Sequence, residues 1–335
     1  MRTFLIISFI FFRISLFGQD KRSEDYGFRH LHTTYKSDPV DILIKSKEGE
    51  EKIKKPLFLF CQGSLPVPLI IKYDKNGKTG IYHVFVFNPD SLSKDYHLVI
   101  INKPYVPLVA EEKSLNSDLS YSDSTGKFPK KYIARNLLTY YVKRNIAVLK
   151  FLRKQQWVAK DELVVAGHSE GSTVAAKIAY EYSKVTELIY ASGNPLGRIM
   201  TLVERSRENE TDSSKTAENI FQYWKNIIAN PGDMSFPGDT YKLTYQYSYP
   251  PPMNYLKKIR IPVLISYGTK DYGLAYADDY FRIEMLRLKK TNFTFQDYVG
   301  VEHNFFPLKT NGEINYDIFN WDKVADDWKN WLRKK

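Results

Sequence analysis

Hydrophobic residues along this chain fall into short runs that alternate with segments of helical spacing. Short apolar runs bounded by polar or turn residues predict buried strands, whereas apolar residues three and four positions apart predict amphipathic helices. Strands are expected at 41–46, 56–61, 97–102, 163–166, 187–192, 261–268 and 293–298. Helices are expected at 132–151, 174–179, 220–228 and 275–288. This alternation predicts an α/β protein with a mostly parallel central sheet that helices cover on both faces.

Three segments depart from the alternation. Residues 70–74 and 81–87 flank the turn-forming pair Asn76-Gly77 and predict a β-hairpin insertion. Residues 195–258 are polar, partly helical and rich in Pro and Tyr, so we interpret them as a cap inserted after the sixth strand. The polar residues 21–40 are expected to form a partly ordered leader.

The most informative motif is Gly167-His168-Ser169-Glu170-Gly171, which lies between a buried strand and a helix. A serine hydroxyl becomes a useful nucleophile only when a positioned base takes its proton. A tight turn from strand to helix exposes the serine Oγ above the sheet, and glycines on both sides of the serine avoid collisions. The alternative is that Ser169 only caps the helix, because serine is a favoured N-cap residue.

Partners for Ser169 follow it along the chain. Asp271 comes after the apolar strand at 261–268, where loops at the carboxyl ends of strands carry functional groups. His303 follows the last expected strand, and the sequence has no other histidine after Ser169. The order Ser, Asp, His predicts a triad with Ser169 as nucleophile, His303 as general base and Asp271 as the group that orients the histidine.

Each assignment has a structural alternative. Asp271 could be a turn aspartate that binds its own backbone, and His303 could be an exposed loop histidine. Asp278 and Asp279 compete with Asp271, but both fall within or at the start of a helix. The combination of three features in the required order favours the catalytic interpretation.

With these motifs the sequence resembles the α/β-hydrolase superfamily, through GHSEGS at the elbow, GTKD at the acid and VEHNF at the histidine. The resemblance runs from about residue 55 to the end and implies an oxyanion hole. One donor would be the backbone N–H of Glu170, and the second that of Ser64 or Gly63, where QGS stands in place of the family's His-Gly-Gly run. The Glu170 side chain could touch substrate, or it could simply favour the positive end of a helix dipole.

Aromatic residues of the expected cap have two interpretations, since they could line an acyl pocket or pack the cap onto the sheet. They are Tyr223, Trp224, Tyr241, Tyr245, Tyr247 and Tyr249.

The N-terminal segment predicts a cellular compartment, and the composition argues against some classes of partner. Residues 1–19 combine Arg2, an apolar run and a small residue, which predicts a cleaved signal peptide, a secreted or periplasmic protein and a catalytic domain over 20–335. Because Arg13 interrupts the apolar run, the alternative is a weak membrane anchor or an amphipathic lead-in. We expect no stable membrane span after cleavage. The net charge of +11 is scattered along the chain, so we expect a solvated surface and no nucleic-acid partner. The single cysteine, Cys61, is expected to be a buried small hydrophobe.

These features together predict a serine hydrolase that cleaves a carboxylic ester of a small-molecule or peptide acyl substrate. A peptidase or an acyltransferase on the same scaffold, and a non-catalytic binding protein with the same fold, are the alternatives. No zinc-spaced Cys/His cluster, phosphate loop or dinucleotide fingerprint is present in the sequence, so no metal and no organic cofactor is expected. The oligomeric state is not determined by these patterns.

Overall fold

An eight-stranded sheet forms the centre of the protein, for which a computed structural model describes residues 23–75, 78–83, 85–208, 210–235 and 239–334. The predicted signal peptide at 1–19 lies outside the described residues. From β6 to β11 all neighbouring strands are parallel, while β1 and β2 are antiparallel to their neighbours, which confirms the mostly parallel sheet. The order is β1 (Arg29–Tyr35), β2 (Asp38–Lys45), β6 (His97–Ile101), β3 (Lys55–Cys61), β8 (Val158–His168), β9 (Glu187–Ala191), β10 (Val263–Gly268) and β11 (Phe293–Tyr298).

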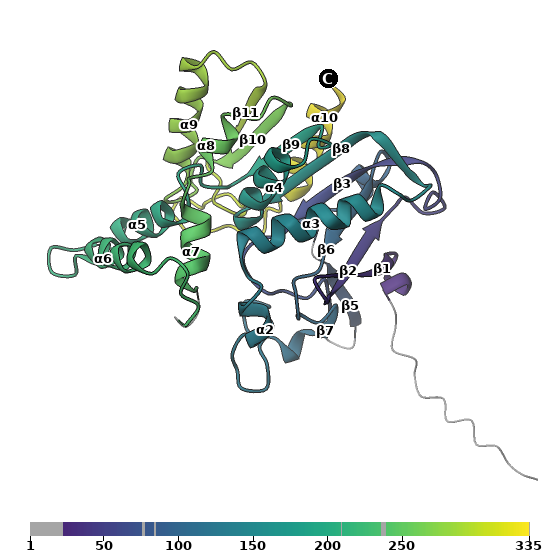
Figure 1. Ribbon diagram of the computed structural model, residues 1–335, viewed down its shortest axis with the longest axis horizontal. Coiled ribbons are helices and arrows are strands. Elements are labelled where there is room, and N and C mark those ends of the chain that lie inside the picture. Colours follow the sequence, from purple (N-terminus) through teal and green to yellow (C-terminus); the bar gives the residue numbers. More distant parts are fainter. Residues whose placement is uncertain (1–22, 76–77, 84, 209, 236–238, 335) are drawn as a thin grey trace, which may run out of the picture.

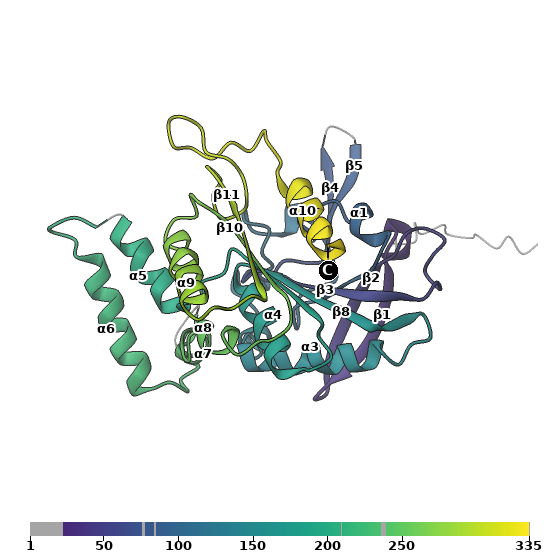
Figure 2. The same ribbon diagram turned by 90° about the horizontal axis from the view of Figure 1, so that it is seen from above.

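Helices cover the sheet on both faces, as the sequence predicts (Figures 1 and 2). Because side chains alternate along a strand, β3 sends Leu57 and Leu59 into one core and Phe58 and Phe60 into the other. The first core includes residues of α3 (Leu138–Leu152), α4 (Glu170–Glu181) and α9 (Ala275–Arg287). The second includes residues of α1 (Asp90–Ser93) and α10 (Trp321–Arg333).

A small second sheet contains the predicted hairpin. Strands β4 (Ile70–Lys75) and β5 (Lys78–His83) pair in antiparallel register, and β7 (Val109–Glu111) adds to β4 in parallel. The turn residues 76–77 lie outside the described residues. The second strand ends earlier than predicted, because Phe85 and Phe87 leave the hairpin and are buried in the core beside α10.

Two predictions about the N-terminal half are wrong. Residues 29–35 form the edge strand β1 rather than a leader, because the backbone of this segment pairs with β2 along its whole length, although most of its side chains are polar. The long helix expected at 132–151 is divided into α2 (Lys130–Ile133) and α3, since Leu137 is extended with φ −138° and ψ 138°. Short 3₁₀ turns occur at η1 (Ser23–Tyr26) and η2 (Glu112–Ser114).

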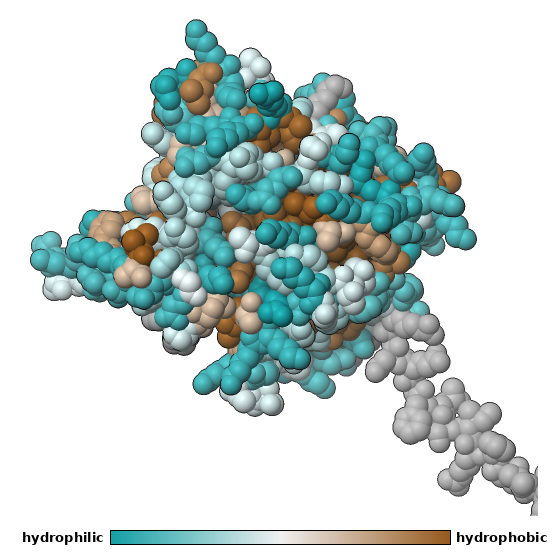
Figure 3. Space-filling model, in the orientation of Figure 1, coloured by the Kyte–Doolittle hydropathy of each residue, from teal (hydrophilic) through white to brown (hydrophobic). Residues whose placement is uncertain are grey.

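Four helices occupy the segment between β9 and β10 that the sequence suggests as a cap. They are α5 (Arg198–Glu208), α6 (Thr216–Ala229), α7 (Tyr241–Ser248) and α8 (Met253–Leu256). Helices α5 and α6 pack together and project beyond the sheet (Figures 1 and 2). Figure 3 shows hydrophobic colour at this end of the molecule. Phe221 and Ile228 of α6 are among the exposed large hydrophobic residues. Among the described residues, no helix has both the length and the apolar character needed to cross a bilayer.

Candidate active site

Ser169 occupies the turn between β8 and α4 in a backbone conformation that side chains rarely adopt, with φ 57° and ψ −128°. Its N–H donates to the carbonyl oxygen of Ala191 at 3.0 Å. Its carbonyl oxygen accepts from the N–H of Ser172 at 3.1 Å and from the Ser172 hydroxyl at 2.6 Å. These hydrogen bonds to Ala191 and Ser172 hold the strained turn, and strain of this kind is typical of functional sites.

Both glycines of the motif stand where a side chain has no room. A Cβ on Gly167 would lie 2.1 Å from the carbonyl oxygen of Gly171. A Cβ on Gly171 would lie 2.1 Å from the carbonyl oxygen of Cys61, at the end of β3. The motif therefore needs glycine at these positions so that the helix can approach two neighbouring strands closely.

Gly171→Ala is expected to lower the free energy of unfolding by at least about 2 kcal/mol, because the new methyl group overlaps backbone atoms that cannot move aside. Chemical denaturation measures the effect. Gly232→Ala is the matched control, since nothing lies within 4 Å of a Cβ at Gly232. Equal stability of the two variants would contradict this account of the elbow.

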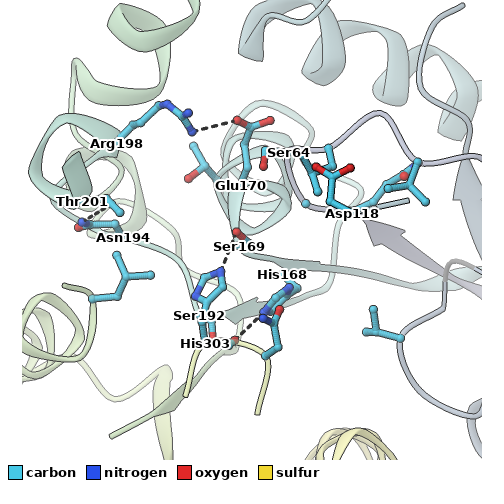
Figure 4. Close-up of a pocket in the computed structure, with 18 of the residues that line it drawn as sticks. Ser64, Asp118, His168, Ser169, Glu170, Ser192, Asn194, Arg198, Thr201 and His303 are labelled. Atoms are coloured by element: carbon cyan, nitrogen blue, oxygen red, sulfur yellow. Dashed lines mark hydrogen bonds and ion pairs between the residues drawn. The ribbon is translucent and has the colours of Figure 1, made fainter. Parts of the chain in front are cut away.

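The structure brings the three predicted triad residues into one hydrogen-bonded chain. The His303 Nε2 lies 2.9 Å from the Ser169 Oγ, and the His303 Nδ1 lies 2.8 Å from the Asp271 Oδ2 (Figure 4 shows the contact with Ser169). The Asp271 side chain is 1% exposed, and that of His303 is 20% exposed. An ionised carboxylate can only accept a hydrogen bond, so Nδ1 carries the proton and Nε2 is left to accept one from the serine hydroxyl.

The loop that carries His303 is fixed from three sides. The Glu302 carboxylate accepts hydrogen bonds from the N–H groups of Asn304 at 2.8 Å and Phe306 at 3.0 Å. The loop also crosses the end of β10 so closely that a Cβ on Gly268 would lie 2.4 Å from the carbonyl oxygen of Val301. Backbone anchoring of this kind fixes the imidazole before any substrate binds.

His168 provides the third anchor, which the sequence analysis missed. Its Nε2 lies 2.8 Å from the carbonyl oxygen of His303, so this nitrogen carries a proton and donates it. Burial, and to a lesser extent the neighbouring His303, lower the pKa of His168 to about 3, so the ring stays neutral near pH 7. Its position beside the nucleophile was visible in the motif, but its partner 135 residues away was not.

The two competing aspartates have other surroundings. The Tyr267 hydroxyl donates to the Asp279 carboxylate at 2.7 Å. Asp278 is 1% exposed, and neither of its carboxyl oxygens has a hydrogen-bond partner among the described residues. Burial, together with the negative charges of Asp271 and Asp279, raises the pKa of Asp278 well above its ordinary value. Only Asp271 of the three contacts His303.

Asp278→Asn is expected to stabilise the protein near neutral pH. An acid whose pKa is raised by folding releases its proton when the chain unfolds above about pH 4, so its contribution to stability falls as the pH rises. Asparagine resembles the neutral acid but does not ionise. Thermal unfolding from pH 4 to pH 8 should therefore show an advantage of the variant that grows with pH to about 1 kcal/mol or more. Parallel curves for the two proteins would contradict a buried neutral acid.

A pocket of about 700 Å³ opens at Ser169 and His303. Gly63, Ser64 and Glu170, the predicted sources of oxyanion donors, line it as well. A Cβ built on Gly63 would lie 3.7 Å from the Ser169 Cβ, so the loop after β3 passes directly beside the nucleophile. Glu170 is the first residue of α4, where backbone N–H groups have no partner within the helix.

The pocket has one apolar and one polar wall. The apolar wall comes from the loop after β3, from β4 and from the segments that follow β5 and η2, and it includes Val67, Pro68, Ile71, Val86 and Leu119. The polar wall comes from the loop after β9 and from α5. It includes Arg205 as well as Asn194, Arg198 and Thr201, which Figure 4 labels.

Most of the aromatic residues of the inserted segment pack against one another instead of lining the pocket. Tyr223 packs edge to face on Tyr241, and Trp224 stacks on Tyr245. Tyr247 is the member of the predicted set that reaches the pocket. Both pairs join α6 to α7, so these four side chains neither line the pocket nor pack the cap onto the sheet.

Glu170 has a partner that neither sequence interpretation anticipated. Its side chain is only 6% exposed, and its Oε2 lies 3.5 Å from the Arg198 Nη1. Arg198 also pairs with Asp239. This ion bridge joins the residue after the nucleophile to α5 and to the segment that precedes α7 (Figure 4).

Within the described part of the chain, no three His, Cys, Asp or Glu side chains gather in a way that could hold a metal ion. Cys61 is 5% exposed and packs in the core between the sheet and α3, which confirms its predicted role as a buried hydrophobe.

The sheet order, the turn at Ser169 and the histidine loop after the last strand define the α/β-hydrolase fold, and this chain adopts it. Solved structures agree. An acylaminoacyl peptidase from Pyrococcus horikoshii is similar with a TM-score of 0.55 and 15% identity, covering 92% of this chain and 41% of its own. Est1E from Butyrivibrio proteoclasticus is similar with a TM-score of 0.52 and 13% identity, covering 91% of this chain and 98% of its own.

Sequence comparison finds a likeness to part of one curated protein. No family model matches the sequence. The uncharacterized peptidase YtmA of Bacillus subtilis (strain 168) is 24% identical over 178 residues, which are 53% of this chain and 61% of that protein. The chain thus spans about three fifths of the length of this curated relative.

Proposed function

We propose that this protein is a serine hydrolase that cleaves a carboxylic ester through an acyl-enzyme intermediate. The observation that carries the proposal is the continuous hydrogen-bonded chain from Asp271 through His303 to Ser169, which ends in a pocket large enough for a small acyl substrate.

The first half of the reaction forms the acyl-enzyme. His303 Nε2 takes the proton of the Ser169 hydroxyl while Oγ attacks the ester carbonyl carbon. Asp271 stabilises the imidazolium that results. The backbone N–H of Glu170, together with that of Ser64 or Gly63, binds the oxygen that gains negative charge. His303 then gives its proton to the departing alcohol as the ester bond breaks.

The second half repeats the chemistry with water. His303 takes a proton from water as its oxygen attacks the acyl carbon, and it returns this proton to the Ser169 Oγ when the tetrahedral intermediate collapses and releases the acid. Within the protein, only Ser169 and His303 exchange protons in this cycle, while the backbone donors supply hydrogen bonds alone.

Reaction with a fluorophosphonate probe tests the proposal. An activated serine attacks the phosphorus and displaces fluoride, and peptide mass spectrometry locates the adduct. We expect a single adduct on Ser169 that heating the protein beforehand abolishes. Correctly folded protein that does not react with the probe would overturn the proposed function in favour of a non-catalytic binding role.

The apolar wall predicts which esters are accepted. Val67, Ile71 and Leu119 line the same pocket as Ser169, so an acyl chain of four to six carbons would bury more apolar surface there than an acetyl group. Each methylene group that an apolar pocket binds raises kcat/KM by about 10-fold or more. We therefore expect p-nitrophenyl butyrate and hexanoate to exceed the acetate by at least about 10-fold, and equal rates across the series would contradict an apolar subsite.

A peptidase is the second candidate, because the similar proteins include an acylaminoacyl peptidase and the uncharacterized peptidase YtmA. The same triad would form the same acyl-enzyme from an amide, with an amine as the leaving group. Matched ester and amide substrates with one acyl group distinguish the two functions, as does transfer to an added alcohol for an acyltransferase. We further propose that residues 1–19 act as a cleaved signal peptide, which would place this activity outside the cytoplasm, on small-molecule or peptide substrates.

A further inference from the structure

Two side chains from distant parts of the chain bind one carbonyl oxygen beside the nucleophile. The Lys103 Nζ donates to the carbonyl oxygen of Ser64 at 2.7 Å. The Tyr132 hydroxyl donates to the same oxygen at 3.1 Å. Ser64 belongs to the loop after β3 that lines the pocket next to Ser169.

A third contact ties the same loop to the same neighbouring segment. The Gln62 Nε2 donates to the carbonyl oxygen of Ile101, the last residue of β6, at 2.9 Å. The segment at 101–103 therefore holds the loop at both Gln62 and Ser64. The Ser64 carbonyl belongs to the planar Ser64–Leu65 peptide group, so its hydrogen bonds fix that plane. Together with the Gln62 contact, they restrict the backbone on both sides of the Gly63 and Ser64 N–H groups.

Burial of the Lys103 ammonium at this point is unfavourable in free energy. It is 4% exposed, and no carboxylate lies within ion-pairing distance of it among the described residues. Its ammonium faces the ring of Tyr141, with 5.4 Å to the centroid, and the guanidinium of the nearby Arg144 is buried too. Burial lowers the pKa of Lys103 to about 8, although the negative charge of Glu170 opposes this shift.

The carboxylate of Glu170 does not neutralise this charge directly, because it is paired with Arg198. A buried cation without a close counter-ion produces a positive potential in its surroundings, where the low dielectric screens it little. In this protein the surroundings of Lys103 include the 62–64 loop, whose N–H groups would bind the oxyanion. Both the contact and the charge of Lys103 thus act on the same small region.

We propose that Lys103, assisted by Tyr132, is the positioning residue of the oxyanion hole: its ammonium binds the Ser64 carbonyl and so orients the N–H donors of the 62–64 loop toward the developing oxyanion. The inference rests on the proposed serine-hydrolase function. Lys103 itself does not touch substrate. It acts through the loop, and its charge adds to the field that stabilises the tetrahedral intermediate.

Lys103→Met tests the inference, because methionine preserves the bulk of the side chain without its charge or its hydrogen bond. We expect kcat for ester hydrolysis to fall ~10- to 100-fold while KM changes less than about threefold, since misplaced donors weaken binding of the transition state more than that of the ester. The affinity for butylboronic acid, which forms a tetrahedral adduct with Ser169, should fall by the same factor as kcat.

Lys55→Met is the matched control. Lys55 is also a buried lysine that donates to backbone carbonyls, those of Ser93 at 3.1 Å and Lys94 at 2.9 Å. It lies at the opposite end of β3 from the loop. We expect it to lose thermal stability but to keep its kcat within about twofold of the wild type. Tyr132→Phe, which removes one hydroxyl and no charge, should lower kcat by a smaller factor, and it replaces Lys103→Met if that variant fails to fold.

The outcomes separate this inference from the function on which it depends. If the wild type is active and Lys103→Met and Tyr132→Phe both turn over esters and bind the boronic acid as Lys55→Met does, the positioning role is wrong and the function stands. If the wild type neither turns over esters nor reacts with the fluorophosphonate, the proposed function is wrong and this inference fails with it.

Discussion

Replacing Ser169 with alanine is expected to lower kcat for ester hydrolysis by about 10⁴-fold or more while the protein remains folded. Alanine removes only the Oγ that lies 2.9 Å from the His303 Nε2. Without it no acyl-enzyme forms, and the remaining rate comes from binding and from the oxyanion donors alone. Initial rates with p-nitrophenyl butyrate measure the loss, and far-ultraviolet circular dichroism checks the fold.

Ser183→Ala supplies the comparison for a serine that has no place in the site. Ser183 follows α4 on an exposed part of the surface, so its replacement should change neither rate nor labelling. Fluorophosphonate should modify the wild type and Ser183→Ala equally and leave Ser169→Ala unmodified. Turnover of Ser169→Ala within a factor of ten of the wild type would rule out the mechanism.

Asp271→Asn is expected to have the second-largest effect, a loss in kcat of about 10⁴-fold. The Asp271 Oδ2 lies 2.8 Å from the His303 Nδ1 and is almost fully buried. An amide in this place can present its NH₂ group to Nδ1, which favours the tautomer with the proton on Nε2. That tautomer cannot accept the proton of Ser169.

Asp278→Asn is the matched control for Asp271→Asn, because it makes the same chemical change seven residues along the chain at an equally buried carboxyl. Asp278 has no contact with His303, so its replacement should leave kcat within about threefold of the wild type. If the two variants lost activity equally, Asp271 could not be assigned as the orienting acid. A parallel loss of thermal stability in Asp271→Asn would be corrected for by measuring kcat well below its unfolding temperature.

Much of the catalytic machinery could be predicted from the sequence, because its physical requirements are local. The elbow needs a short apolar strand, two glycines and a helix within a few residues, and all of them stand next to Ser169. Asp271 and His303 were found by their position after apolar strands and by chain order. Since parallel strands end at the same edge of a sheet, residues in their following loops meet there.

Other features could not be predicted because their partners come from distant segments. The sequence does not indicate that Arg198 would pair with Glu170, that His168 would hold the His303 backbone, or that Lys103 would bind Ser64. Each is a contact of one polar atom with another, and such pairings leave no periodic signal. Polarity even misled the interpretation of 29–35, whose strand combines backbone pairing with β2 along its length with the packing of Leu31 and Tyr35 on the core.

The sequence by itself determined the class of fold, the nucleophile turn and the order of the three residues that meet there. Hydrophobic periodicity and glycine placement encode these features within short windows of the chain. Only the tertiary structure decided which wall of the pocket is apolar, which charges are buried behind the loop after β3, and how the cap helices attach to Glu170. These features depend on packing between segments that can be more than a hundred residues apart. Burial and the geometry of single polar contacts determine the interaction energies there.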